Sequence, residues 1–129
     1  MKIQPLQQWV LEYIDPEDYA DFLSDSGPAF SLVTNNNAIL GCAGVRELGL
    51  HRGESWALIS EDIGTDFIHF HKAVLEFLKQ VHLERVELSA DVNHPETKRW
   101  AEMLGFKLEG LMHKFYPNGN DAYLYARVK

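Results

Sequence analysis

The sequence predicts one α/β domain, covering residues 1–129, with a mixed, mostly antiparallel β-sheet flanked by helices on both faces. Three observations carry this prediction. Residues 66–81 place apolar side chains at helical spacing, and residues 85–90 alternate apolar and polar side chains as a half-buried strand does. Residues 117–121, Pro-Asn-Gly-Asn-Asp, form a turn signal between two further strand-like stretches.

The first quarter of the chain is predicted from its turn and capping residues. Residues 1–6 favour a strand, which a proline at the fifth position restricts to a sheet edge or a strand end. Residues 15–25 favour a helix, because they begin with an aspartate cap followed by a proline in the first turn. The pattern leaves open whether residues 9–14 form a helix of their own.

Three strands are expected next. Residues 30–34 and 38–48 are typical of a hairpin, closed by three asparagines that tolerate positive φ. A turn at residues 51–53 then leads to a strand at residues 55–60.

The long helix at residues 66–81 is amphipathic. Four polar residues share one side: His69, Lys72, Glu76 and Lys79. Six apolar residues share the other side and are expected to face the core: Phe67, Phe70, Val74, Phe77, Leu78 and Val81.

The last third of the chain is predicted to contain a strand at residues 85–90, a helix and a hairpin. The helix begins at Asn93 or His94 and ends at Leu104, and Gly105 is the expected left-handed stop. The terminal hairpin comprises two strands: residues 107–115 and residues 122–128.

Composition limits the classes of partner. The net charge is −7, and no basic run exceeds Lys98-Arg99, which argues against nucleic acid, because phosphate binding needs a concentrated positive face. No apolar stretch approaches the roughly 20 residues of a membrane span, and the N-terminus lacks a signal-peptide pattern. The single cysteine, Cys42, excludes an internal disulfide and fits a reducing compartment. We therefore expect a soluble, cytoplasmic protein without a membrane partner.

The order of elements, together with four short sequences, resembles the Gcn5-related N-acetyltransferases, the GNAT superfamily, over nearly the whole chain. The strongest match is Trp-Ala-Glu-Met-Leu-Gly-Phe at residues 100–106, followed by Glu109-Gly110. The sequences at residues 56–61, 113–119 and 124–128 are similar to a short branch of the superfamily that tailed bacteriophages encode.

The resemblance implies an acyl-CoA-dependent N-acetyltransferase that moves acetyl from acetyl-CoA to an amine of unknown identity. The acceptor would be a small amine, a protein lysine or a protein N-terminus. The alternative is a catalytically degenerate, virion-associated or binding protein that kept the fold and lost turnover. The partners implied are acetyl-CoA and an amine, with a homodimer or phage virion proteins as further options, in the host cytoplasm or the virion.

In the superfamily, a glycine-rich Gln/Arg-x-x-Gly-x-Gly/Ala loop cradles the CoA pyrophosphate at the start of the long helix. Here Asp66 stands at the Gln/Arg position, His69 and His71 stand at the glycine positions, and the nearby glycine is Gly64. An ordinary well-capped amphipathic helix explains the same residues without a ligand. The resemblance nevertheless implies these cofactor-binding residues: Leu58, Ile59, Ser60, Phe67, Ile68, His69, His71, Lys72 and Asn93.

Two residues are the candidates for catalysis. Family members often place a glutamate base on the strand before the long helix, and here Glu54 and Glu61 bracket that strand. Glu54 is the better candidate by position, although a solvated strand-end glutamate is the plainer interpretation. Ala101 stands where the family has the tyrosine that protonates the leaving sulfur. Tyr116 is the preferred substitute from the last hairpin, with Tyr123 and Tyr125 as alternatives, whereas strand tyrosines are mostly packing residues.

Other chemistries fit the sequence less well. Asn93 is as suited to capping a helix as to contacting a cofactor. His69 and His71 are two residues apart and do not share a helical face, so no metal site is predicted. Cys42 is expected to be an inert buried thiol beside two glycines. An enzyme should keep a V-shaped split between the strands at residues 55–60 and 85–90, which a structural protein can instead fill with Trp56, Trp100 or Phe67.

Overall fold

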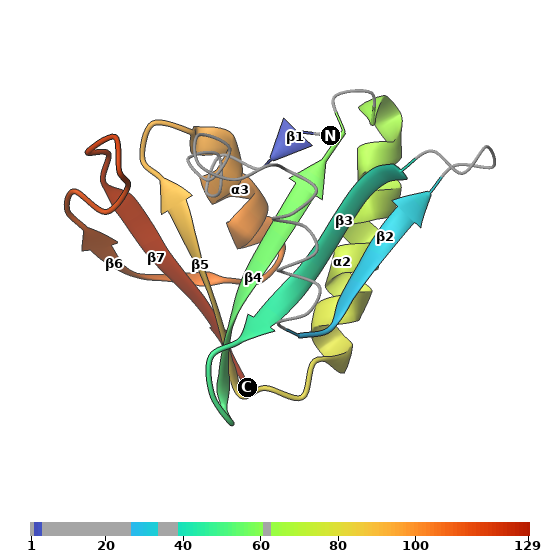
Figure 1. Cartoon of the computed structure of the whole chain (residues 1–129), viewed down its shortest axis with the longest axis horizontal. Coiled ribbons are helices and arrows are strands. Elements are labelled where there is room, and N and C mark those ends of the chain that lie inside the picture. The colour runs from blue at the N-terminus through green and yellow to red at the C-terminus, as the bar shows by residue number, and fades with distance from the viewer. Residues whose placement is uncertain (1, 4–26, 34–38, 61–62) are drawn as a thin grey trace.

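The computed structural model describes residues 2–3, 27–33, 39–60 and 63–129. In these residues a seven-stranded sheet has the order β2-β3-β4-β5-β7-β6, and β1 pairs with β4 outside this path (Figure 1). The strands are β1 (Lys2–Ile3), β2 (Ala29–Val33), β3 (Ile39–Glu47), β4 (Arg52–Ile59), β5 (Arg85–Asp91), β6 (Lys107–Met112) and β7 (Ala122–Val128).

The sheet is mixed and mostly antiparallel, as predicted. The pair β4–β5 is parallel, whereas every other strand pair in the described residues is antiparallel. The helices are a short 3-10 turn η2 (Gly64–Asp66), the long helix α2 (Phe67–Gln80) and the helix α3 (Pro95–Met103). This element order confirms the predicted α/β fold class.

The sequence predicts helices on both faces of the sheet. Among the described residues, α2 and α3 both pack on one face, which we call the helix face. Cross-strand partners share a face, so Ala43 and Ala57 lie on the helix face together with Val86 and Tyr125. These residues join one core with the buried side of α2 and with Leu104 and Phe106 after α3. The helix expected over residues 15–25, and the turn expected over residues 35–37, lie outside the described residues.

The amphipathic pattern of α2 is confirmed. Phe70, Val74 and Leu78 are buried, and Phe67 and Phe77 pack against the core at its border. The four polar residues predicted for the opposite side are all exposed: His69, Lys72, Glu76 and Lys79. No helix in the described part of the chain is long and apolar enough to cross a membrane.

The predicted turn at residues 51–53 is wrong, because β4 already begins at Arg52. The carbonyl of Arg52 accepts a hydrogen bond from the Leu48 N–H at 2.9 Å, and Gly53 pairs with Glu47. Gly53 suggests a turn in sequence, but it is buried in a strand where a Cβ would lie 2.6 Å from Val45 and 2.7 Å from Leu83. The glycine serves close packing rather than chain reversal.

The last hairpin differs from prediction at one end. β6 ends at Met112 instead of residue 115, because Lys114 adopts a φ of 51° and its N–H donates to the Asp121 carboxylate at 2.8 Å. The N–H groups of Phe115 and Tyr116 both donate to the carbonyl of Asn120, which closes a tight loop instead of extending the strand.

The end of α3 follows the prediction. Gly105 has a φ of +89°, which is the left-handed conformation that only glycine adopts without strain. The chain then reverses, and the Phe106 N–H bonds the carbonyl of Ala101 at 3.0 Å.

Candidate functional site

The two central strands separate soon after they meet. β4 and β5 pair at three positions, where Arg52, Gly53 and Glu54 face Arg85, Val86 and Glu87. Beyond this point β4 continues beside β3 and β5 continues beside β7, and the two strands diverge (Figure 1). The sheet therefore contains the V-shaped split expected of an acetyltransferase fold, with its vertex at Glu54 and Glu87.

β1 lies on the β4 edge of this split. Lys2 faces Ile59 and Ile3 faces Leu58 in an antiparallel pair. Because β3 pairs with the same residues of β4 on the other edge, β1 has to lie on the edge that faces β5. The main chain of Leu58 and Ile59, predicted to contact a cofactor, thus pairs with another strand of the same chain. The Ser60 N–H also bonds within the chain, because it donates to the Leu40 carbonyl at 2.8 Å.

A cavity opens on the helix face of the split. Its volume is about 30 Å³, which exceeds the roughly 10–15 Å³ that one water molecule needs. Residues of β3, β4, β5 and both helices line it, among them Ala43, Ser55, Leu88, Thr97 and Trp100.

Thr97 is the unusual residue of this cavity. Its side chain is 2% exposed, and its hydroxyl has no hydrogen-bond partner. The hydroxyl of Ser55, in contrast, donates to the carbonyl of Glu87 at 3.3 Å. Sequence reasoning missed Thr97, because a threonine inside a helix carries no local signal of function.

Trp100 connects α3 to the start of α2. Its indole N–H donates to Nδ1 of His71 at 3.0 Å, and its ring lies 5.3 Å from Phe67 and 6.1 Å from Phe70, centroid to centroid. Trp100 and Phe67 thus pack together, and Trp100 also lines the cavity. Because an indole N–H only donates, Nδ1 of His71 must accept, and the imidazole proton is then on Nε2.

The remaining predicted cofactor residues of α2 face outward. Ile68, His69 and Lys72 are exposed, and the His69 ring contacts the Asp66 carboxylate at 3.4 Å. Gly64 has a φ of +50° and precedes the helix, so the start of α2 has no glycine cradle. The first main-chain N–H of α2, that of Phe67, already donates to carbonyls of η2, so the anion-binding groups that remain here are the exposed side chains of His69 and Lys72.

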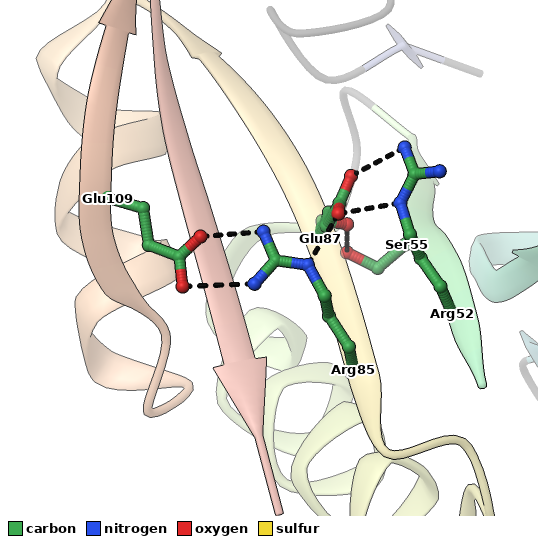
Figure 2. Close-up of polar contacts among 5 residues, drawn as sticks. All are labelled: Arg52, Ser55, Arg85, Glu87 and Glu109. Atoms are coloured by element: carbon green, nitrogen blue, oxygen red, sulfur yellow. Dashed lines mark hydrogen bonds and ion pairs between the residues drawn. The ribbon is translucent and has the colours of Figure 1, made fainter.

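On the face opposite the helices, Glu87 is held tightly. Arg52 Nε donates to its carboxylate at 2.7 Å and Arg85 Nε at 2.6 Å, while Arg85 also binds Glu109 at 2.6 Å (Figure 2). These arginines lower the pKa of Glu87, chiefly through the hydrogen bond from Arg52.

Glu54 shares this face and is less constrained. It has one longer contact, 3.6 Å from Arg46. Of the two carboxylates at the vertex of the split, Glu54 is therefore the less tightly bound.

Tyr116 is brought to the same face by the last hairpin. It is buried, and its hydroxyl donates to Ser89 Oγ on β5 at 3.1 Å. Burial is the main cause that raises the pKa of Tyr116 to about 12, and the nearby carboxylates of Asp91 and Glu54 also oppose its ionisation. Tyr116 is therefore protonated at neutral pH, with its hydroxyl directed at the β5 side of the split.

Asp91 and Asn120 extend this polar group, and sequence reasoning missed both. The buried Asp91 carboxylate accepts from the Asn93 N–H at 2.9 Å and from Asn120 Nδ2 at 3.0 Å. Asn93 uses its main chain here and does not cap α3, whose N-cap is His94 without a side-chain cap bond. The sequence signal that could have identified Asp91 is an aspartate at a strand end followed by a polar turn.

Tyr123 and Tyr125 of β7 lie on the helix face and pack there. The hydroxyl of Tyr125 donates to Glu102 at 3.1 Å, and Lys98 Nζ lies 5.3 Å from the ring centroid of Tyr123. Cys42 is buried, which raises the pKa of its thiol to about 11. In the described residues, no three histidine, cysteine or acidic side chains come together as a metal site.

The chain has no match among protein-family models or among curated proteins. It is, however, similar in structure to solved acetyltransferases. A GNAT-family acetyltransferase from Bacillus anthracis aligns over 98% of this chain and 92% of its own, with 18% identity and a TM-score of 0.66. A GNAT-family acetyltransferase from Elizabethkingia anophelis, solved with acetyl-CoA bound, aligns over 88% and 83%, with 18% identity and a TM-score of 0.69.

A third similar structure is the spermidine/spermine N-acetyltransferase SpeG from Vibrio cholerae. It aligns over 87% of this chain and 71% of its own, with 19% identity and a TM-score of 0.65. At these identities the similarity shows the fold. The chain has the GNAT α/β fold.

Proposed function

We propose that the chain is an acyl-CoA-dependent N-acetyltransferase whose transfer site is the split between β4 and β5. The observation that carries this proposal is the early end of the β4–β5 ladder, which leaves a cavity on the helix face and Glu54 and Tyr116 on the opposite face. Structures of the same fold are named N-acetyltransferases, and one of them contains acetyl-CoA.

The residues at the split fit the thioester-bearing arm of acetyl-CoA better than the residues at the start of α2 fit its pyrophosphate. The cavity offers room beside the split, between the sheet and the two helices. For the pyrophosphate, the chain offers the exposed side chains of His69 and Lys72, because the first main-chain N–H of α2 is already bonded to η2. Asp66 opposes this charge.

In this proposal Glu54 accepts the proton that the attacking amine releases, either directly or through a water molecule. A bond forms between the amine nitrogen and the acetyl carbon, and the bond from that carbon to sulfur breaks. Tyr116 donates a proton toward the leaving sulfur, with Ser89 holding its hydroxyl in place. Acetyl-CoA supplies the acetyl group as an activated thioester.

The acceptor is an amine, and the carboxylates of Glu54 and Asp91 favour a cationic one. The net charge of −7 agrees with this preference. A phage-encoded origin, a virion role, a homodimer and the cytoplasmic location stay predictions from the sequence.

The second candidate is a binding protein that kept the fold without turnover. The pairing of β1 with the β4 edge, the packing of Trp100 on Phe67, and the absent glycine cradle favour it.

Titration calorimetry with acetyl-CoA separates the two candidates. We expect micromolar binding, and no heat up to millimolar acetyl-CoA would overturn the enzyme proposal. If binding is found, thiol release over a panel of amines identifies the acceptor. Glu54→Gln should then lower kcat by roughly 10²- to 10⁴-fold without changing the Kd for acetyl-CoA. Glu76→Gln, the same change on the exposed side of α2, should leave both unchanged.

A further inference from the structure

Asp91 is a buried carboxylate at the end of β5. It is 5% exposed, and among the described residues no lysine, arginine or histidine forms an ion pair with it. Its partners are amides, namely the Asn93 N–H at 2.9 Å and Asn120 Nδ2 at 3.0 and 3.3 Å. Because a buried carboxylate is costly unless donors satisfy it, these two amides are what keeps Asp91 in place.

Asn120 connects Asp91 to the loop at residues 113–121. Its side chain binds Asp91, while its main-chain carbonyl accepts the N–H groups of Phe115 at 3.0 Å and of Tyr116 at 3.1 Å. Tyr116 is the buried residue of this loop, and Phe115 beside it is exposed. One asparagine therefore joins the end of β5 to the main chain that carries Tyr116.

The loop meets β5 just beyond the vertex of the split. Glu87 is the last residue of β5 that pairs with β4, and Ser89 and Asp91 follow it at steps of two residues. Residues two apart on a strand share a face, so all three lie on the face opposite the helices. The Tyr116 hydroxyl donates to Ser89 at 3.1 Å, and the loop that carries it binds Asp91. The loop is thus attached to β5 at two neighbouring positions of one face.

The hairpin itself does not depend on the Asp91 side chain. β6 and β7 pair along their length. At the base of the loop, the Asp121 carbonyl accepts the Val92 N–H at 3.1 Å, and the Asp121 carboxylate accepts the Lys114 N–H at 2.8 Å. A change at Asp91 should therefore leave both strands paired and loosen the loop around Tyr116.

We propose that Asp91 positions Tyr116 at the split by way of Asn120. The carboxylate holds the side-chain amide, the carbonyl of the same asparagine holds the main chain of the tyrosine, and the phenol is thereby kept against β5. Asp91 is a positioning residue, because it acts through the tyrosine and touches neither the acyl group nor the amine. Its consequence for catalysis rests on the proposed function, whereas the restraint on the loop does not.

Hydrogen exchange, followed by NMR without any ligand, tests the restraint. Asp91→Asn or Asn120→Asp should speed exchange of the Phe115 and Tyr116 N–H groups about 10- to 100-fold, because each removes a hydrogen bond to a charged group. Asp91→Asn/Asn120→Asp exchanges the two groups, so an amide again meets a carboxylate and the rates should return to within about threefold of wild type. Asn118→Asp is the control: it adds the same charge to the loop and keeps an acceptor for the Asn120 N–H.

Turnover tests the catalytic consequence, with an amine acceptor from the panel. Asp91→Asn should lower kcat about 5- to 50-fold with little change in the KM for acetyl-CoA. In a Tyr116→Phe background the same substitution should have no further effect on kcat, because no hydroxyl is left to position.

The outcomes separate the restraint, the catalytic role and the proposed function. Unchanged exchange in Asp91→Asn, or no recovery in the double variant, overturns the restraint. Losses of kcat that add in Asp91→Asn and Tyr116→Phe overturn the positioning role, because Asp91 then acts independently of the tyrosine. Absence of acetyl-CoA binding by wild type overturns the proposed function and this catalytic role, and the exchange rates still decide the restraint. If Asp91→Asn does not fold, Asn120→Ala takes its place, because it removes the amide at a half-buried position.

Discussion

The Glu87 carboxylate on β5 binds Arg52 of β4 and Arg85 of its own strand, at the point where β4 and β5 have only three ladder pairs. Arg52 donates twice, at 2.7 and 3.1 Å, and Arg85 donates once at 2.6 Å (Figure 2). The Glu87 side chain is 13% exposed, whereas that of Arg52 is 52% exposed. Glu87→Gln keeps the size of this side chain and removes its charge, so the variant measures the contribution of the network at the vertex of the split.

The magnitude follows from this partial burial. Exposed ion pairs contribute about 0.2–1 kcal/mol, and breaking a fully buried pair costs about 3–5 kcal/mol. With a mostly buried carboxylate and a half-exposed partner, we expect Glu87→Gln to lower the free energy of unfolding by about 1–2 kcal/mol. For a domain of this length, that corresponds to a Tm lower by roughly 3–8 °C.

The same network predicts a pH dependence. The arginines lower the pKa of Glu87 in the folded state below its ordinary value of 4.5. The contribution of the ionised Glu87 carboxylate to the free energy of unfolding is therefore fully present above pH 4.5. It is lost as the pH falls through the lower pKa of the folded state. Urea unfolding followed by circular dichroism, from pH 7 down to pH 3, should show wild type and Glu87→Gln converging at the acidic end.

Glu109→Gln is the matched comparison, because Glu109 binds the same Arg85 at a more exposed position. It should lose less stability than Glu87→Gln. Equal stability of wild type and Glu87→Gln at pH 7 would refute the reasoning, as would a difference that does not change with pH.

Three further predictions follow from local geometry. Iodoacetamide at pH 8 should label Cys42 at least about 100-fold more slowly in the folded protein than in urea, because burial suppresses the reactive thiolate; similar rates would contradict its burial. Gly53→Ala should destabilise the fold by about 1–3 kcal/mol in urea melts, since its Cβ would meet Val45, whereas Gly110→Ala, with open space around it, should not. Ile3→Pro should weaken β1 pairing and tighten acetyl-CoA binding about 2- to 10-fold by calorimetry, and unchanged binding would exclude competition.

Elements with strong local signals were predictable from the sequence. The stripe that includes Phe70 and Val74 defines α2, and Gly105 defines the end of α3, because periodicity and a left-handed stop act within a few residues. Local signals failed where distant residues decide the outcome. Gly53 resembles a turn residue in sequence, but the side chains of Val45 and Leu83 require its small size inside a strand.

The candidate site was predictable in part for the same reason. Glu54 and Tyr116 were proposed from their places in the chain, and the structure puts both on one face near the vertex of the split. Thr97 and Asp91 were not proposed, because their importance depends on burial and on missing or distant partners. Sequence spacing also does not reveal which strand pairs with which, so the pairing of β1 with β4 could not be predicted from the sequence.

The position of β1 changes how weak cofactor binding would have to be interpreted. If the proposed function holds, an extended pantetheine arm in the split would compete with the main chain of β1 for the same edge of β4, at Leu58 and Ile59. If β1 leaves this edge only part of the time, the apparent Kd for acetyl-CoA rises by the inverse of that fraction, even when the site itself is intact. A degenerate site would instead bind acetyl-CoA weakly whether or not β1 is paired with β4. The affinity of the Ile3→Pro variant thus distinguishes an occupied enzyme site from a lost one.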